Sequence, residues 1–432
     1  MSITKQFLKY VIQNIFGMLG ISCYIIADTF FKAKAAGANG ITALNLVLPV
    51  YSLIFAIGSM IGVGSATRYA ILKAQKEKQA EYFFTNALWS VWIIGIFGVL
   101  AGIFIPDCIL AWMGGDATIV ALGTDYTRIF LLFTPFFMMN YVVSAFVRND
   151  NAPSTAMIGT LAGSLSNILF DYIFMFPMQM GLKGAALATA ASPIISMLIC
   201  STHFFSKKNT IRLHRILPSV RRFVSSCQLG ISAFIGEISS GITTAVFNFL
   251  ILGLVGNVGV AAYGVIANYA LVATSVFNGV AQGSQPLLSL YYGKNDGKSV
   301  HKILRYGFFT AVLIALLIIL GCYAFTDPLI ALFNSEQSVE LAGYAYTGMR
   351  LYVIGFLFAG INIVGTGFLS ATEQAKGAFV TSLMRGFILI IVCSLLLSRI
   401  LGLNGVWLAF PTAELITALT LVVILKVTIQ NH

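Results

Sequence analysis

Twelve apolar runs, each of about 20 residues or more, constrain this chain more than any other feature of its sequence. Each run can cross the roughly 30 Å hydrocarbon core of a bilayer as an α-helix, which satisfies its backbone hydrogen bonds internally. The runs lie at 10–31, 44–67, 83–105, 119–146, 155–178, 182–205, 226–252, 258–291, 303–325, 345–370, 375–400 and 403–425. Only 9% of the residues are charged, too few for a water-soluble surface. The sequence therefore predicts an all-α integral membrane protein with twelve transmembrane helices.

The 26 Lys and Arg residues are unevenly distributed among the loops. An even number of spans puts both termini on one side, where 19 of the 26 fall; six lie on the other side and Arg385 lies inside a span. Cytoplasmic loops are enriched in basic residues, so we expect a multi-pass protein of the cell (inner) membrane with both termini in the cytoplasm. The basic stretch 207–222 is predicted to touch anionic lipid headgroups, which explains the net charge of +11 without nucleic acid.

The two halves of the chain resemble each other. Gly181–Ala188 matches Gly402–Ala409 at an offset of 221 residues, and two further sets of residues match at offsets of 219 and 222. Six spans per repeat give both halves one orientation, so we expect two lobes related by a pseudo-two-fold axis along the membrane normal. The predicted organisation is an N-terminal six-helix lobe at 1–205, a basic cytoplasmic linker at 206–225 and a C-terminal six-helix lobe at 226–432. A cavity between two such lobes suits alternating access.

Four of the 15 acidic residues fall inside apolar runs: Asp28, Asp171, Glu237 and Glu414. A carboxylate in mid-membrane costs on the order of 3 kcal/mol even on the more lenient insertion scale. Each of the four is therefore a candidate functional residue, with a protonated or ion-paired structural acid as the alternative.

An all-oxygen cluster is expected near the outer side of the N-terminal half. Asp28, Asp171 and Thr189 each lie roughly 6–10 Å below the outer boundary, at 1.5 Å of rise per residue. Asn167 precedes Asp171 by one helical turn and shares its face. Two carboxylates, an amide and a hydroxyl suit a hard cation or a proton, not a transition metal. The sequence therefore predicts a cation-coupling site, which would hold Na+ if the coupling ion is sodium.

The other acids suggest a second set of candidates. Arg385 and Glu414 differ in depth by roughly 5 Å, so they can form a structural ion pair, with a substrate role for Glu414 as the alternative. Glu237 lies in a run without Lys or Arg and is the better candidate for contacting a cationic substrate. Methionines offer a soft, polarisable cavity lining, with core packing as the alternative; the candidates are Met138, Met139 and Met175.

Motifs of soluble enzymes are not found in the sequence. Gly293–Ser299 has three residues between its glycines where a P-loop has four, and no strand is expected before it. There is no nucleophile elbow or zinc-protease motif, and the histidines are too far apart for a metal site. We expect no enzymatic activity and no cofactor, with transport energy coming from an ion gradient or a partner ATPase.

Several segments together resemble the multidrug and toxic compound extrusion (MATE) family over nearly the whole chain. They are Ile25–Phe31, Asn167–Phe174, Gly181–Thr189, Gln285–Leu287 with Tyr292-Gly293, and Gly405–Glu414. The resemblance implies that the positions of Asp28, Asn167, Asp171 and Thr189 form a cation site in the N-terminal lobe, the same four residues that depth places together. Gln285, in the Gln-Pro segment, is a further candidate for the substrate cavity.

We therefore expect a secondary antiporter that exports amphipathic organic cations, such as drugs and dyes, in exchange for Na+ or H+. One alternative is a flippase of lipids or lipid-linked oligosaccharides from the same superfamily, although four acids and one base in the spans favour cationic cargo. A membrane receptor or scaffold is the other alternative, but it would not need buried acids. The expected partners are small cationic substrates and the lipid bilayer, without nucleic acid, and the expected state is a monomer.

Overall fold

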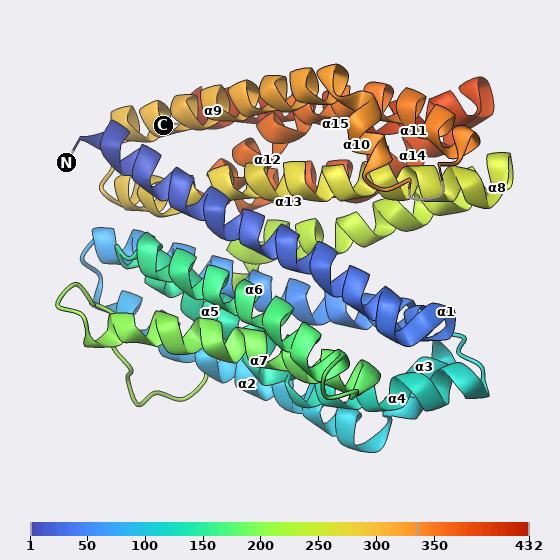
Figure 1. The fold of residues 1–432 in the computed structure, drawn as a ribbon. Coiled ribbons are helices and arrows are strands. Elements are labelled where there is room, and N and C mark those ends of the chain that lie inside the picture. Colours follow the sequence, from blue (N-terminus) through green and yellow to red (C-terminus); the bar gives the residue numbers. More distant parts are fainter. Residues whose placement is uncertain (1, 335–336, 431–432) are drawn as a thin grey trace. The chain divides into compact units, whose positions relative to one another are not determined.

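The computed structural model describes residues 2–334 and 337–430, which form helices and no strand (Figure 1). The α-helices are α1 (Ile3–Ala74), α2 (Glu81–Phe104), α3 (Pro106–Trp112), α4 (Ala117–Leu132), α5 (Thr134–Asn149), α6 (Pro153–Met175), α7 (Gly181–Ser201), α8 (Val220–Gly293), α9 (Gly297–Ala324), α10 (Thr326–Ala331), α11 (Val339–Tyr352), α12 (Phe356–Ala371), α13 (Ala375–Leu383), α14 (Leu389–Leu401) and α15 (Leu403–Gln430). Short 3-10 turns occupy Lys78–Ala80, Thr202–Phe205 and Val353–Gly355, and a π-helical turn at Met384–Ile388 joins α13 to α14.

The helices account for the predicted twelve spans. Among the described residues, nine helical segments are long and apolar enough to cross a membrane, and the pairs α4–α5 and α11–α12, bent by 45° and 48°, each add one. One of the nine is the 74-residue α8, far longer than the roughly 20 residues of a single span. Its helical path is broken at Gly256, with φ 75° and ψ −162°, so it supplies two spans. The prediction of an all-α membrane protein is confirmed.

The sequence repeat returns as a repeated order of elements. In the first half, α2 is followed by the short α3, the bent pair α4–α5 and the long helices α6 and α7. In the second half, α9 is followed by the short α10, the bent pair α11–α12, the α13–α14 span and α15. The two halves therefore share one helical plan.

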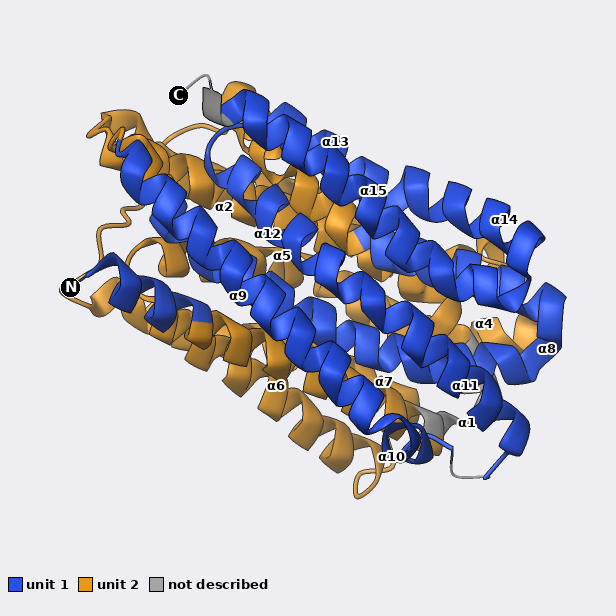
Figure 2. Ribbon diagram, turned by 90° about the horizontal axis from the view of Figure 1, so that it is seen from above, with its two compact units in different colours: residues 1–11, 238–288, 296–432 blue, residues 12–237, 289–295 orange. Residues whose placement is uncertain are grey.

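The described chain forms two compact units (Figure 2). Unit 2 comprises Ile12–Glu237 and Ser289–Asn295, and unit 1 comprises Met1–Val11, Ile238–Leu288 and Asp296–His432. Two boundaries between the units, after Glu237 and after Leu288, fall within α8, so this one helix contributes residues to both units.

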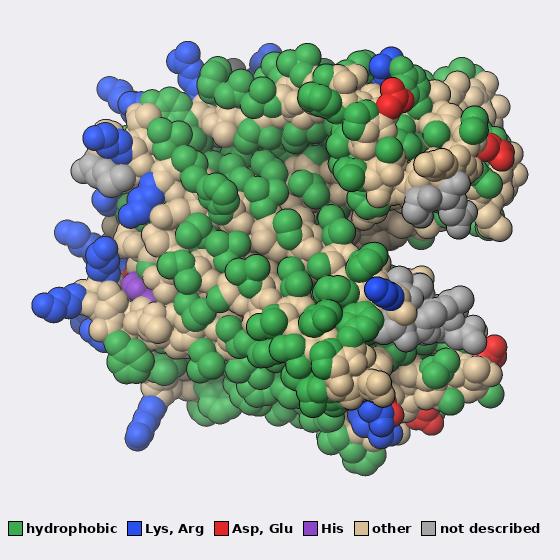
Figure 3. Space-filling model, in the orientation of Figure 1, with side chains coloured by type: hydrophobic (Ala, Val, Ile, Leu, Met, Phe, Trp, Pro, Cys, Tyr) green, Lys and Arg blue, Asp and Glu red, His purple; other side chains and the backbone are tan. Residues whose placement is uncertain are grey.

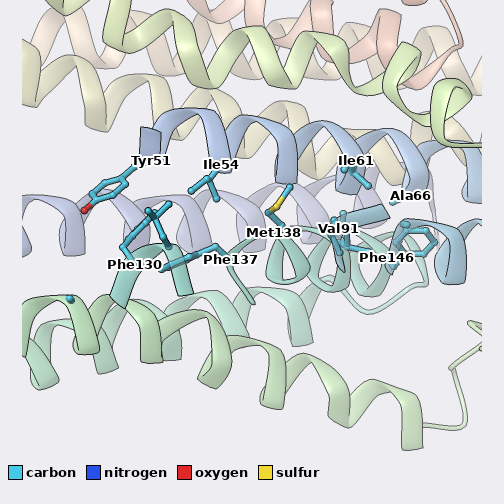
Figure 4. Close-up of a cluster of buried hydrophobic side chains, with 14 of the residues drawn as sticks. Tyr51, Ile54, Ile61, Ala66, Val91, Phe130, Phe137, Met138 and Phe146 are labelled. Atoms are coloured by element: carbon cyan, nitrogen blue, oxygen red, sulfur yellow. The ribbon is translucent and has the colours of Figure 1, made fainter. Parts of the chain in front are cut away.

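Aromatic stacking organises the core of unit 2 (Figure 4). The Phe130 ring stacks on Tyr51, with 3.6 Å between centroids, and on Phe137, with 4.4 Å. Ile54, Ile61 and Met138 belong to the same buried cluster. Offset or tilted aromatic pairs contribute about 0.5–1.5 kcal/mol beyond area burial. This packing joins the second span of α1 to α4 and α5.

The surface of each unit is that of a membrane protein. Large apolar side chains are exposed along the sides of the helices, including Leu165, Leu198, Leu317 and Leu320. Figure 3 shows hydrophobic side chains covering the flanks, while Lys and Arg gather at one end of the helices in each unit. An apolar surface of this extent is stable only against lipid or a partner, so the chain is a multi-pass membrane protein.

The segment 206–219 between α7 and α8 lacks helical structure, yet it is fixed to unit 2 by hydrogen bonds. The Ser219 amide donates to Asn86 Oδ1 at 2.7 Å, and the His214 amide donates to Thr85 Oγ1 at 3.1 Å. Nearer α7, the Thr210 amide donates to Asp150 Oδ2 at 2.8 Å. The stretch expected to be a linker is therefore anchored along the ends of α2 and α5.

Asp150 is the centre of this anchor. It is fully buried at the end of α5 and accepts hydrogen bonds from Lys73 Nζ at 2.7 Å and His203 Nε2 at 2.8 Å. The Thr210 hydroxyl and Tyr69 also donate to it. Burial by itself raises the pKa of this carboxyl, but the hydrogen bonds from Lys73, Thr210 and His203 outweigh burial and hold the pKa below its usual 3.8. The ionised form therefore stabilises the fold.

The anchor predicts an acid-dependent stability. Because the folded-state pKa of Asp150 lies below the unfolded value, the stabilisation is present above about pH 4 and is lost as the pH falls through the folded-state value. We expect Asp150→Asn to lower the melting temperature at pH 7 and to flatten its fall between about pH 5 and pH 2. Melting curves of the purified protein test this, with the exposed Asp107→Asn as the matched control. An unchanged acid dependence in Asp150→Asn would contradict it.

Two glycines let the second span of α1 approach the start of α8. A Cβ atom on Gly64 would lie 1.9 Å from the Ser226 carbonyl oxygen, and one on Gly230 would lie 1.9 Å from the Met60 carbonyl oxygen. Real Cβ atoms do not approach backbone oxygens this closely, so any side chain would force the helices apart.

We expect Gly64→Ala to destabilise the protein by about 1–3 kcal/mol through overpacking. The matched control is Gly253→Ala in α8, where an added Cβ meets nothing within 4 Å and helix propensity favours alanine by about 1 kcal/mol. Melting temperatures in one detergent should move in opposite directions for the two variants. A Gly64→Ala protein as stable as the parent would show that the helices are free to separate.

Candidate functional site

Asp28 lies beside a lysine from the next turn of its own helix. Lys32 Nζ is 2.6 Å from Asp28 Oδ2 and donates to the Tyr126 hydroxyl of α4 at 3.0 Å. The side chains of Lys32 and Asp28 are only 11% and 16% exposed. The first candidate span, Ile3–Lys32, ends at this lysine, close to the predicted end of the first apolar run at residue 31, but the ammonium turns back to the acid. The i,i+4 spacing is the signal that could have identified the pair.

Asp171 and Asn167 lie on the inward face of α6. Both are fully buried, within a stripe of buried residues at helical spacing that includes Gly159, Gly163 and Met175. The small residues of this stripe bring α6 close to α7: a Cβ on Gly163 would lie 2.9 Å from the Ser192 carbonyl oxygen. Close packing of α6 and α7 therefore positions the face that carries Asn167 and Asp171.

Several polar groups of the predicted cluster are not paired with a Lys, Arg, backbone or hydroxyl group among the described residues. They are Asp28 Oδ1, both carboxylate oxygens of Asp171, the amide of Asn167 and the hydroxyl of Thr189 on α7. An unpaired buried polar group costs about 1–3 kcal/mol. The Asp171 carboxylate interacts electrostatically with Asp28 and Lys32, so the fold brings together two acids far apart in sequence. Carboxylate, amide and hydroxyl oxygens are the types of ligand that a hard cation prefers.

Glu237 lies on α8, at the residue where the part of the helix assigned to unit 2 ends. Its electrostatic neighbours include Tyr24 on α1 and Tyr141 on α5. Tyr24 also interacts with Asp28 and Lys32. A tyrosine of α1 therefore has both Glu237 and the Asp28–Lys32 pair as neighbours.

The other cavity candidates are mostly packed. Met138 (Figure 4) and Met175 are buried members of the apolar core. Met139 is half-buried against it. Gln285 is also buried, in the second half of α8. A cargo molecule that reached Met138 or Met175 would have to displace core packing.

A second buried acid, Glu414 on α15, is fully satisfied. Arg385 Nε donates to Glu414 Oε1 at 2.8 Å. The Asn362 amide of α12 donates to Glu414 Oε2 at 2.7 Å and to the Glu414 backbone oxygen at 2.8 Å. Arg385 belongs to the π-helical turn at Met384–Ile388, a distortion that occurs often at functional sites. Sequence reasoning missed Asn362 in this role, because no local pattern connects it with Glu414, 52 residues further along the chain.

The Arg385–Glu414 ion pair predicts that the stability losses of the two single variants do not add up in the double variant. Removing one member of a buried ion pair typically costs about 3–5 kcal/mol, because the remaining charge is left alone. We expect Arg385→Met to lower the melting temperature, and Glu414→Gln in the same protein to restore part of the loss. Melting of the two single variants and the double variant gives the coupling energy. Losses that simply add would show that the two side chains are not energetically coupled.

A helical chain of twelve spans in two similar halves, with carboxylates buried inside, has the architecture of a secondary transporter. The MatE family model matches residues 14–173 and 233–396, three quarters of the chain. The chain therefore belongs to the MatE family, which confirms the resemblance of its motifs.

The similarity to two multidrug export proteins extends over nearly the whole sequence. The multidrug export protein MepA of Staphylococcus saprophyticus is 26% identical over 98% of this chain and 93% of its own length. MepA of Staphylococcus aureus is 26% identical over 97% of this chain and 93% of its own.

Solved structures share the fold. An outward-facing multidrug resistance MATE family transporter of the MOP superfamily superimposes with a TM-score of 0.93 at 20% identity, covering 100% of this chain and 97% of that one. A MOP superfamily transporter from Pyrococcus furiosus, described as having a binding pocket of reverse polarity, gives 0.91 at 20% identity, covering 100% of this chain and 96% of that one.

Proposed function

We propose that this protein is a secondary antiporter that exports amphipathic organic cations in exchange for Na+ or H+ by alternating access. The observation that carries the proposal is a pair of electrostatically interacting acids within a MatE family fold: Asp28, with a side chain 16% exposed, and the fully buried Asp171. Relatives named as multidrug export proteins support the cargo class. The gathering of Lys and Arg at one end of the helices supports cytoplasmic termini (Figure 3).

The charges inside the spans favour a cationic cargo. Arg385 offsets Glu414, whereas Asp28 and Asp171 share the single ammonium of Lys32, so the charge at these two acids is negative when both are ionised. A cavity of negative potential concentrates cations and repels anionic headgroups. This balance favours drug-like cations over the anionic headgroups that a lipid or oligosaccharide flippase would carry.

Coupling follows from the differential stability of two charge states. A Na+ ion or protons at the acids would change the net charge of a poorly hydrated site, and each charge state favours a different helix arrangement. Cargo responds to the same equilibrium without contacting the acids. An inward-moving charge releases about 2.3 kcal/mol per 100 mV, a sufficient scale for uphill export.

We expect Asp171→Asn to abolish active export while dye binding stays within about threefold, or ~0.65 kcal/mol. Asp28→Asn should act in the same direction, and Asn167→Ala and Thr189→Ala should weaken coupling less, since each removes a neutral ligand. The measurements are ethidium transport in proteoliposomes, driven separately by Na+ and by pH gradients, and dye binding by fluorescence anisotropy.

The matched control is Asp125→Asn, an exposed acid that pairs with Lys183 at 2.8 Å. It should export at the parental rate. Parental export by Asp171→Asn under either gradient would overturn the assignment of the coupling site.

A further inference from the structure

Lys32 places a permanent positive charge beside the proposed cation site. Its ammonium approaches Asp28 Oδ2 to 2.6 Å and is held on another side by the Tyr126 hydroxyl at 3.0 Å. It also interacts electrostatically with Asp171. The ammonium therefore occupies a position on Asp28 that a transported cation would otherwise use.

The chemistry of the two cations is similar enough for direct competition. A lysine ammonium is a compact point charge on a flexible four-carbon stem, and it satisfies carboxylate and hydroxyl oxygens as a hard cation does. Asp28, Asp171, Asn167 and Thr189 offer only oxygens, apart from the Asn167 amide nitrogen. A Na+ ion that binds Asp28 through both carboxylate oxygens must first displace Lys32.

Charge adds to this competition. With both acids ionised, the site carries two negative charges, and Lys32 reduces the net charge to one. An entering cation is attracted less strongly to the site with Lys32 than it would be without it, and the difference is large where the local dielectric constant is low.

We propose that Lys32 is a tethered cation that competes with the transported inorganic cation for Asp28 and so determines how well the site accepts Na+. Lys32 is thus a specificity-determining residue for the coupling ion, acting through a neighbouring acid. The proposal rests on the proposed function, because it assumes that Asp28 and Asp171 bind the coupling cation.

The test measures Na+ binding directly in the purified full-length protein. Isothermal titration with NaCl, and the shift in melting temperature as Na+ replaces choline at constant ionic strength, are compared between the parent and Lys32→Met. We expect the variant to bind Na+ at least about tenfold more tightly, equivalent to ~1.4 kcal/mol. A Na+ affinity equal to or weaker than that of the parent would overturn the proposal.

Three further variants separate charge from structure. Lys32→Arg keeps the positive charge and should retain the Na+ affinity of the parent. Lys34→Met removes a lysine from an exposed position two residues away and should change nothing. Lys32→Gln removes the charge but keeps an amide that reaches Asp28 and Tyr126, so it should also gain Na+ affinity and serves as the test if Lys32→Met does not fold.

The double variant Lys32→Met/Asp171→Asn distinguishes this inference from the proposed function. The gain in Na+ affinity should disappear in it, because one of the two acids is gone. If Lys32→Met and Lys32→Gln gain no affinity while Asp171→Asn still abolishes export, Lys32 is not a competitor and the coupling site stands. If Asp171→Asn exports at the parental rate, or the double variant keeps the full gain, the coupling site itself is misassigned.

Discussion

The cost of burying charge in a protein surrounded by hydrocarbon organises the polar side chains of this fold. A charge inside a span is tolerated only when it faces the protein interior and finds a partner. Glu414 receives Arg385 and Asn362, and Asp28 receives Lys32 and Tyr126. At the end of α5, Asp150 accepts hydrogen bonds from four residues that belong to three separate segments. The same rule thus stabilises the interior of both units and the anchor of the segment that follows α7.

Against this pattern Asp171 is the exception. It is fully buried, yet among the described residues no Lys, Arg, amide or hydroxyl group donates a hydrogen bond to it, and the group beside it is another carboxyl, that of Asp28. Its neighbour Asn167 is also buried with its amide unpaired. A stable resting structure would be expected to satisfy such groups, so their retention favours a role in which they bind an ion and release it. Acids with hydrogen-bonded partners stabilise the packing of the helices. Asp171, which lacks such partners, is the acid suited to change its charge state.

Periodicity and composition predict the spans, because the bilayer imposes one length and one polarity on every helix. The bends of the pairs α4–α5 and α11–α12 were not predicted, although they recur in the two halves, near Phe133 and Val353–Gly355. Sequence reasoning fails for Lys32, because a positive residue near the end of an apolar run is expected to reach water. The contacts of Asp150 could not be predicted from the sequence either, because Thr210 and Lys73 lie 60 and 77 residues away in the chain. Long-range polar contacts depend on packing that no local pattern encodes.

The two halves share a helical plan but not its chemistry. Asp28 and Asp171 in the first half have buried Phe247 and Cys393 near their repeat positions in the second. In the second half, an arginine on a π-helical turn neutralises Glu414, and an amide closes the remaining side of the carboxylate. In the first half, the charge state and the ligands of Asp171 can change. In the second half, Glu414 is already held by an ion pair and hydrogen bonds. An ion can shift a conformational equilibrium only through groups whose interactions differ between states. This asymmetry therefore supports our proposal that ion coupling takes place in the first half.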